Sequence, residues 1–262
     1  MDRKNGLKIL AIGNSFAVDT MNHLAKVAAS LGIEPIHFAI LYIGGCSINK
    51  HWALAESDAN EYTYYNSDGG DWEKTEGMSI REAIESDVWD WISIQHGTKD
   101  GSRYTSDESY TNLPRLIEYV KQHCDERTKI AFNMAWVMEP YSHHHEIVSY
   151  NQDSLKMYEA LTELTERLVL PMKDLDAVCP TGTAIQNART TVLADRLSRD
   201  GFHLSYGIGR YIASLTFLRA LTGMSIDEVE WMPEDVSAED CAIALRAANR
   251  AIDAPFRITD LS

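Results

Sequence analysis

Residues 8–16 read Lys-Ile-Leu-Ala-Ile-Gly-Asn-Ser-Phe, an apolar run that ends in a glycine and two small polar residues. A short apolar run that a turn signal closes is typical of a strand buried in a parallel sheet. Apolar side chains then recur at helical spacing over residues 20–31, with Asp19 or Thr20 as the expected N-cap. A strand that turns tightly into a helix is the first half of a βαβ unit, so this stretch predicts an α/β fold.

Strand and helix patterns continue to alternate along the chain. Further strands are predicted at Ile36–Ile43, Trp89–Ile94, Ile130–Ala135 and Leu175–Cys179. Helices are predicted at Ser47–Ala55, after the capping-box pattern at Ser79, and at Asp107–Cys124, Ser149–Leu168, Ile185–Leu197, Leu204–Leu221 and Ala238–Ala251. This order predicts a three-layer α/β/α sandwich around a five-stranded parallel sheet. A chain of 262 residues suits a single domain of this kind, residues 1–262.

An aromatic-rich segment interrupts the alternation. Residues Glu61–Asn66 and Trp72–Gly77 flank a Ser-Asp-Gly-Gly turn, which predicts a β-hairpin insertion at about residues 61–77. Its aromatic residues are Tyr62, Tyr64, Tyr65 and Trp72. Stacking on sugar rings and aromatic pairing across the two strands explain them equally well.

The charge of the chain limits its partners. Aspartate and glutamate number 39 against 24 lysine and arginine, which gives a formal net charge of −15. So acidic a chain repels nucleic acid and anionic membranes, and neither is expected as a partner. The four cysteines form no C-x-x-C pair, and a core of this size does not need disulfides. No signal peptide or membrane span is visible, so the sequence predicts a cytoplasmic protein, or an exported one if a signal peptide was removed. The sequence does not indicate an oligomeric state.

Two distant segments supply the parts of a nucleophilic site. Ser15 follows the first strand, and Asp200-Gly-Phe-His203 lies near the end of the chain. A serine hydroxyl needs an imidazole to accept its proton, and a carboxylate often orients that imidazole. Ser15, Gly45, Gln95 and Asn133 all lie at or near predicted strand ends, so they are expected at one crevice along the carboxyl edge of the sheet.

These segments resemble the sequence blocks of the SGNH (GDSL-like) hydrolases. Residues 11–16 resemble the first block, with Asn14 in place of the usual aspartate, and residues 200–203 resemble the last. The resemblance implies that Ser15, Asp200 and His203 form a catalytic triad, and that the backbone N–H groups of Ser15 and Gly45 belong to an oxyanion hole. Gly45 lies in residues 43–47, which are similar to the second block.

The third block departs from the family. Residues 94–100 read Ile-Gln-His-Gly-Thr-Lys-Asp where Gly-x-Asn-Asp is usual. Some carbohydrate-directed members use a glutamine here, so the resemblance makes Gln95 the candidate side-chain oxyanion donor, with Asn133 as a weaker rival. A glutamine that caps its strand end is the structural alternative.

Several other residues are candidates to line the substrate site. They are Asn14, His96, Asn133 and Trp136, and less directly His51 and Trp52, which could equally pack beneath the hairpin. The run His143–His145 is not expected to bind a metal, because consecutive residues cannot all face one ion and no acidic or cysteine partner has ligand spacing. No cofactor is expected.

The favoured function is a serine esterase that hydrolyses a short-chain acyl ester through an acyl-enzyme, with an acetyl group on a carbohydrate as the substrate that the resemblance suggests. Two alternatives remain open. One is a non-catalytic anion- or sugar-binding protein on a flavodoxin-like fold, which leaves Asp200 and His203 unexplained. The other is an acyltransferase that uses the same triad.

Overall fold

The computed structural model describes residues 6–97 and 103–262. Its centre is one sheet with the strand order β4-β3-β2-β1-β5-β6-β7. The strands are β1 (Leu7–Gly13), β2 (Ile36–Tyr42), β3 (Tyr62–Ser67), β4 (Glu73–Met78), β5 (Trp91–Gln95), β6 (Lys129–Asn133) and β7 (Ala177–Cys179). β1 lies in the middle of the sheet and pairs in parallel with β2 and β5. All five residues from Ile9 to Gly13 are buried, as the apolar run predicts.

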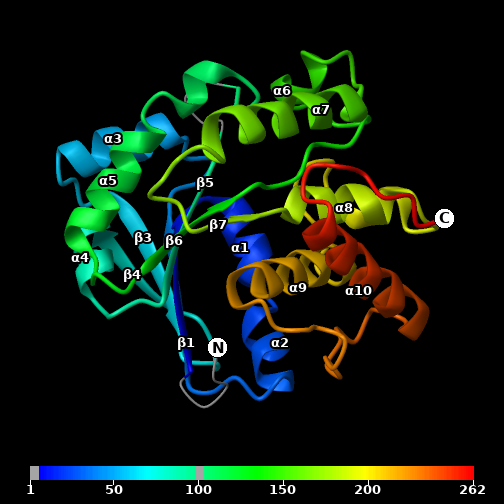
Figure 1. The fold of residues 1–262 in the computed structure, drawn as a ribbon, viewed down its shortest axis with the longest axis horizontal. Helices are drawn as coiled ribbons and strands as arrows, with labels where there is room; N and C mark the ends of the chain where they lie inside the picture. The colour runs from blue at the N-terminus through cyan, green and yellow to red at the C-terminus, as the bar shows by residue number, and fades with distance from the viewer. Residues whose placement is uncertain (1–5, 98–102) are drawn as a thin grey trace.

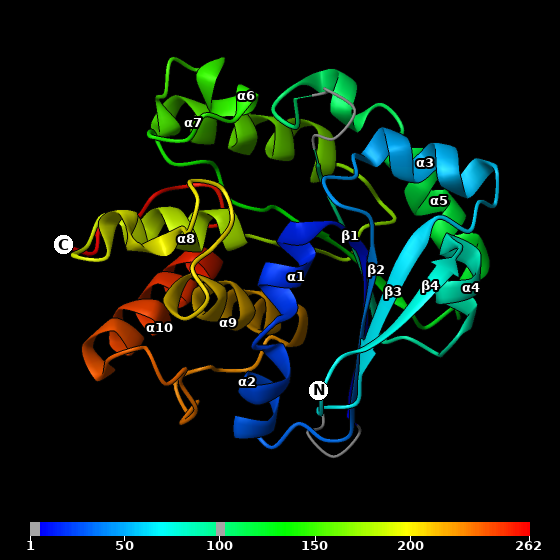
Figure 2. The same ribbon diagram turned by 180° about the vertical axis from the view of Figure 1, so that it is seen from behind.

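Helices cover both faces of the sheet (Figures 1 and 2). One layer holds α1 (Ser15–Met21), α2 (Leu24–Ser30), α8 (Thr181–Arg189), α9 (Ile208–Thr222) and α10 (Ala238–Asp253). The other holds α3 (Ile48–Glu56), α4 (Ile80–Glu85) and α5 (Leu113–His123). Two further helices, α6 (His145–Val148) and α7 (Ser154–Leu164), lie near the end of the molecule at which β1 passes into α1. The α/β/α sandwich is therefore confirmed.

The prediction of a five-stranded, all-parallel sheet is wrong. The five expected strands are present and parallel, but the hairpin adds two antiparallel strands to the same sheet, which is therefore seven-stranded and mixed. β3 pairs with β2 from Phe38 opposite Ser67 to Tyr42 opposite Thr63. This pairing satisfies the backbone groups on the outer side of β2, which would otherwise form an exposed edge. The hairpin is thus an extension of the sheet on the β2 side.

Helix boundaries differ from the prediction mainly where tertiary contacts decide them. The helix expected over residues 20–31 is two helices, α1 and α2, and the first begins at Ser15. Its N-cap is Asn14, whose side chain accepts a hydrogen bond from the N–H of Phe16, not Asp19 or Thr20. The helices expected at Ile185–Leu197 and Leu204–Leu221 are shorter or displaced, at Thr181–Arg189 and Ile208–Thr222.

Local capping signals were more reliable. Ser79 and Glu82 form the expected reciprocal capping box at α4, and Ser47 and Ser237 cap α3 and α10. None of the four cysteines, all of which lie in the described part of the chain, forms a disulfide. In the described part of the chain, no helix is both long and apolar enough to cross a bilayer.

Candidate active site

Ser15 lies at the carboxyl end of the central strand. β1 ends at Gly13, Asn14 makes the turn, and Ser15 is the first residue of α1. The chain order changes direction at β1, since β2 follows on one side and β5 to β7 on the other. Ligands of doubly wound sheets bind at such a switch point, so Ser15 occupies the position where a site is expected.

Asn14 fixes the turn through its whole side-chain amide. Its Nδ2 donates to the carbonyl oxygens of Cys46 (3.1 Å) and His96 (2.9 Å). Its Oδ1 accepts from the N–H of Phe16 (3.0 Å) and from Nε2 of Gln95 (2.7 Å). An aspartate has no hydrogen to donate to the two carbonyl groups. This network accounts for asparagine at the position before Ser15.

The structure brings Ser15, Asp200 and His203 together. Nε2 of His203 lies 2.9 Å from Oγ of Ser15, and Nδ1 lies 2.6 Å from Oδ2 of Asp200. The other oxygen of Asp200 accepts from the N–H groups of Phe202 (3.1 Å) and His203 (2.7 Å), so the carboxylate also fixes its own turn. Burial alone would raise the pKa of Asp200, but the bonds from His203 and the two N–H groups together lower it. The carboxylate therefore stays ionised and beside the imidazole at neutral pH.

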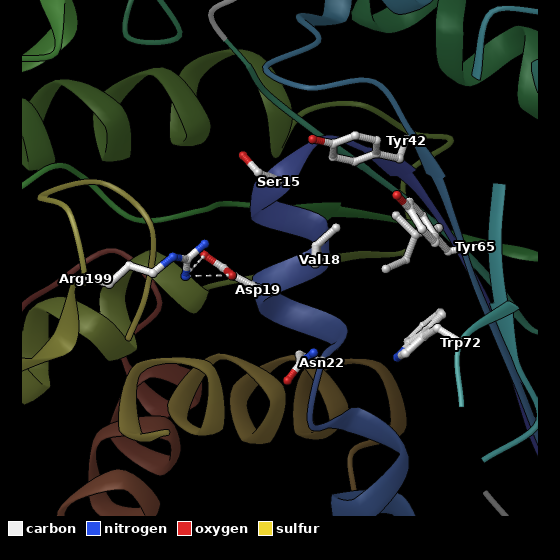
Figure 3. Close-up of a pocket in the computed structure, with 9 residues that line it drawn as sticks. Ser15, Val18, Asp19, Asn22, Tyr42, Tyr65, Trp72 and Arg199 are labelled. Carbon is white, nitrogen blue, oxygen red and sulfur yellow. Dashed lines mark hydrogen bonds and ion pairs between the residues drawn. The ribbon is translucent and has the colours of Figure 1, made fainter. Parts of the chain in front are cut away.

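Asp19, one helical turn after Ser15, holds the segment that carries His203. Its fully buried carboxylate accepts from Nη1 of Arg199 (3.1 Å), Nε of Arg210 (2.8 Å) and the N–H of Leu204 (2.9 Å). Figure 3 shows Arg199 reaching Asp19 on α1 from the neighbouring loop. Because Leu204 follows His203 directly, this bond sets the height of the imidazole relative to α1. Sequence reasoning missed Asp19, although a lone carboxylate in the apolar run Phe-Ala-Val-Asp-Thr-Met was a visible signal.

A second set of bonds holds the same segment from the other side. The N–H of Glu139 donates to the carbonyl oxygen of Gly201 (2.7 Å), and Nε1 of Trp136 donates to that of Phe202 (2.7 Å). Trp136 is buried and packs on Phe16, with ring centroids 4.7 Å apart. Trp136 therefore supports the His203 segment from behind and does not line the substrate site as expected.

A cavity of about 300 Å³ opens beside Ser15 and His203. The other residues that line it include three glycines and three aromatic residues. The full set is Asn14, Phe16, Tyr42, Gly44, Gly45, Gly97, Met138, His144 and Phe202. Gly97 has no room for a side chain, because a Cβ there would overlap the carbonyl oxygen of Cys46. Gly45 has a φ of +65°, a conformation that favours glycine. The Gly45 expected near Ser15 is thus at the cavity, together with Gly97, which sequence reasoning did not single out.

Three predicted site residues lie elsewhere. Gln95 is buried, and its amide nitrogen bonds Asn14 instead of facing the cavity. His96 is buried against Tyr104, with the two rings 4.3 Å apart and nearly parallel. Asn133 is also buried, where its side chain bonds the hydroxyl groups of Thr20 and Thr181. Residues 98–100 of the divergent third block lie outside the described residues.

The other aromatic and histidine candidates divide between core and surface. Tyr62 and Tyr64 are buried, and Tyr62 bonds Nδ1 of buried His51 (2.7 Å), so neither His51 nor these tyrosines reach the site. Trp52 packs on Tyr119 of α5.

Of the histidine run, His144 lines the cavity. Burial, helped by the charges of His145 and His203, lowers its pKa to about 4, so it is neutral at pH 7. Within residues 6–97 and 103–262, no group of three or more His, Cys, Asp or Glu residues is placed to hold a metal ion.

Comparisons with known proteins agree with this architecture. Axe2, an acetylxylan esterase from Geobacillus stearothermophilus, is 17% identical, with a TM-score of 0.50 over 83% of this chain and 94% of that chain. LAE5, an alpha/beta hydrolase enzyme from the metagenome of Lake Arreo, Spain, is 13% identical, with a TM-score of 0.52 over 82% of this chain and 95% of that chain. These likenesses show that the three chains share a fold.

A nearer relative and a family model extend over almost the whole chain. A DUF4886 family protein from Bacteroides uniformis ATCC 8492 is 31% identical, with a TM-score of 0.91 over 98% of both chains. No curated protein is significantly similar. The model of the domain of unknown function DUF4886 matches residues 8–251. The chain therefore belongs to the DUF4886 family.

Proposed function

We propose that the protein is a serine esterase that hydrolyses short-chain acyl esters through an acyl-enzyme. The observation that carries the proposal is the continuous chain of contacts from Ser15 Oγ to His203 Nε2 (2.9 Å) and from His203 Nδ1 to Asp200 Oδ2 (2.6 Å). Both distances lie within the range that proton transfer and imidazole orientation require. A non-catalytic binding protein has no need of this arrangement.

In the first step, Oγ of Ser15 attacks the ester carbonyl while Nε2 of His203 accepts the hydroxyl proton. The bond between the carbonyl carbon and the alcohol oxygen then breaks, and His203 gives the same proton to the departing alcohol. Water next attacks the acyl-serine, again with His203 as base, and releases the acid and free Ser15. Asp200 keeps its negative charge throughout and stabilises the imidazolium.

Backbone N–H groups are the proposed oxyanion donors. The N–H of Ser15 is the first of α1, and the first N–H groups of a helix have no intrahelical acceptor. Gly45 borders the cavity from the turn after β2 and supplies the second donor. Gln95 is left out of the proposal, because its amide is buried against Asn14. Gln95 is instead a positioning residue, because its bond to Asn14 holds the turn that carries Ser15.

The proposed acyl group is short, such as acetyl. The cavity of about 300 Å³ is small and has Phe16, Met138 and Phe202 in its lining. A carbohydrate is the proposed alcohol; the fold neighbour Axe2 is named as an acetylxylan esterase, which agrees with an acetylated sugar.

Ser15→Ala tests the proposal most simply, with Ser225→Ala as the control at an exposed serine of another loop. On 4-nitrophenyl acetate, Ser15→Ala is expected to lower kcat by about a thousandfold or more. Ser225→Ala is expected to keep the wild-type rate. Wild-type turnover by Ser15→Ala would overturn the proposal. Acetate release measured with and without glycerol as acceptor separates hydrolysis from acyl transfer, which uses the same residues.

A further inference from the structure

A second cavity, of about 400 Å³, meets the first at Ser15 and Tyr42, which line both. It runs along α1 between that helix and the β2–β4 side of the sheet. Val18 of α1 and Asn22, the C-cap residue of that helix, form one wall. Tyr42 of β2, Tyr65 of β3 and Trp72 of the hairpin turn form the other. Figure 3 shows these three aromatic side chains in a row opposite α1, starting near Ser15 and ending at Trp72.

We infer that this second cavity, here called the aromatic groove, binds the ring of a neutral sugar alcohol whose ester Ser15 cleaves. The inference rests on the proposed function and adds to it the place where the alcohol half of the ester lies. An ester carbonyl carbon carries two groups, and the two cavities that meet at Ser15 can hold one each. The acyl group occupies the smaller cavity, and the sugar occupies the groove until its oxygen takes the proton from His203.

The chemistry of the walls favours a sugar over an acyl chain. Tyr42, Tyr65 and Trp72 are each half-buried and offer ring surface. No hydrogen bond within residues 6–97 and 103–262 uses the Asn22 amide, the Tyr65 hydroxyl or the Trp72 indole N–H. A hydrocarbon chain would displace water from these groups and return no hydrogen bond, which is unfavourable. A pyranose ring presents apolar faces to aromatic rings and hydroxyl groups at its edge, so it can satisfy both.

Charge points to a neutral sugar. The one cationic side chain that borders the groove, among the described residues, is Arg199, and it is already paired with Asp19 (3.1 Å), which lines the groove as well. The net charge of −15 opposes the approach of an anionic sugar. A single paired arginine does not offset that repulsion.

The hairpin places two of the three aromatic side chains that line the groove. Trp72 lies in the segment that joins β3 to β4, and this segment would hang free if the hairpin did not pair with β2. Tyr42 and Tyr65 are in edge-to-face contact, with ring centroids 5.9 Å apart and planes at 72°. The antiparallel extension of the sheet thus places Tyr65 and Trp72 along the groove that begins at Ser15, from a part of the chain that carries no triad residue.

The test is a ratio of two substrates. We compare kcat/KM for acetate release from methyl 6-O-acetyl-glucopyranoside, which keeps free hydroxyl groups on its ring, with that for ethyl acetate, whose alcohol has no ring to fill the groove. Trp72→Ala is expected to lower the ratio about tenfold, a typical effect of losing an aromatic stacking surface together with its apolar contact area. Asn22→Ala is expected to lower the same ratio about fivefold, as the loss of a hydrogen bond does. Trp52→Ala, on the opposite helical layer, is the matched control and is expected to leave the ratio unchanged.

The outcomes separate the two proposals. If the wild type cleaves both esters but Trp72→Ala and Asn22→Ala keep its ratio, the sugar site is refuted and the esterase stands. If Trp72→Ala instead changes the preference between ethyl acetate and ethyl octanoate, the groove binds the acyl chain, which also refutes the inference. If the wild type cleaves neither ester and Ser15→Ala behaves like it, the proposed function itself fails. Thermal unfolding of each variant checks that it is folded.

Discussion

Asp19→Asn is expected to cost both stability and catalysis, although Asp19 does not touch the serine or the imidazole. The substitution keeps the size of the side chain and an oxygen that can accept from the N–H of Leu204. It removes the charge that faces Arg199 and Arg210, whose side chains are 24% and 12% exposed. Two guanidinium groups are then left without their buried counter-charge.

The magnitude follows from the burial. Breaking a buried ion pair by neutralising one partner costs about 3 kcal/mol. For a chain of this length, that lowers Tm by roughly 6–12 °C, at about 2–4 °C per kcal/mol. The activity effect comes through Arg199, which pairs with Asp19 and whose backbone N–H donates to the carbonyl oxygen of His203 (3.0 Å). A shift of about 1 Å in the imidazole can reduce the rate about a hundredfold. With ethyl acetate, whose alcohol does not fill the groove that Asp19 lines, the substitution affects positioning and not substrate binding, so the loss should fall on kcat more than on KM.

The assay combines urea unfolding with ester hydrolysis at a temperature where the variant is folded. Asp125→Asn is the control, because Asp125 pairs with Arg127 at an exposed site, and such pairs contribute about 0–1 kcal/mol. The reasoning is refuted if Asp19→Asn unfolds like the control and retains the wild-type kcat.

Three further predictions concern the asparagine turn, the orienting carboxylate and a buried histidine. Asn14→Asp should lower the unfolding free energy by about 2–4 kcal/mol, because it turns a carboxylate towards the carbonyl groups of Cys46 and His96; urea midpoints equal to the wild type would contradict this. Asp200→Asn should lower kcat by about 10³–10⁴-fold with little change in fold, because the amide can hold the imidazole in the wrong tautomer; circular dichroism checks the fold, and a fall of less than tenfold would count against the orienting role. His96→Phe should flatten the pH dependence of stability. Burial lowers the pKa of His96 to about 3, so the unfolded chain takes up a proton below about pH 6.5 while the folded chain does not. The wild-type unfolding free energy therefore falls by about 1.4 kcal/mol per pH unit from His96 as the pH drops from about 6 to 4. Urea titrations at three pH values in that interval should show the slope reduced by this amount in the variant, and an equal slope would refute the assignment.

The parts of the structure that the sequence predicts are those that local patterns decide. The apolar run before Gly13 could only be a buried strand in this context, and the capping residues Ser47 and Ser79 act within three positions of themselves. The triad could be predicted because Ser15, Asp200 and His203 lie in two short, recognisable segments. The α/β topology brings both segments to one edge of the sheet.

The parts that were missed depend on contacts between distant residues. Asp19 is an apparent helix cap in the sequence, and only its partners some 180 positions away show that it is a buried anchor. Gln95 lies at a strand end, as an oxyanion donor would, but its amide N–H donates to the side chain of Asn14 and does not face the cavity. The sequence predicts the hairpin but not its pairing with β2. That pairing depends on which edge of the parallel sheet is left without a partner strand, and local sequence patterns do not show this.

The most direct measurement is the reaction of the wild-type protein with a fluorophosphonate, followed by intact-mass analysis and peptide mapping. The account predicts one adduct, on Ser15, that is absent in Ser15→Ala and forms at least about a hundredfold more slowly in His203→Ala, because the hydroxyl is activated only beside the imidazole. Labelling at another residue, or equally fast labelling of Ser15 without His203, would contradict it.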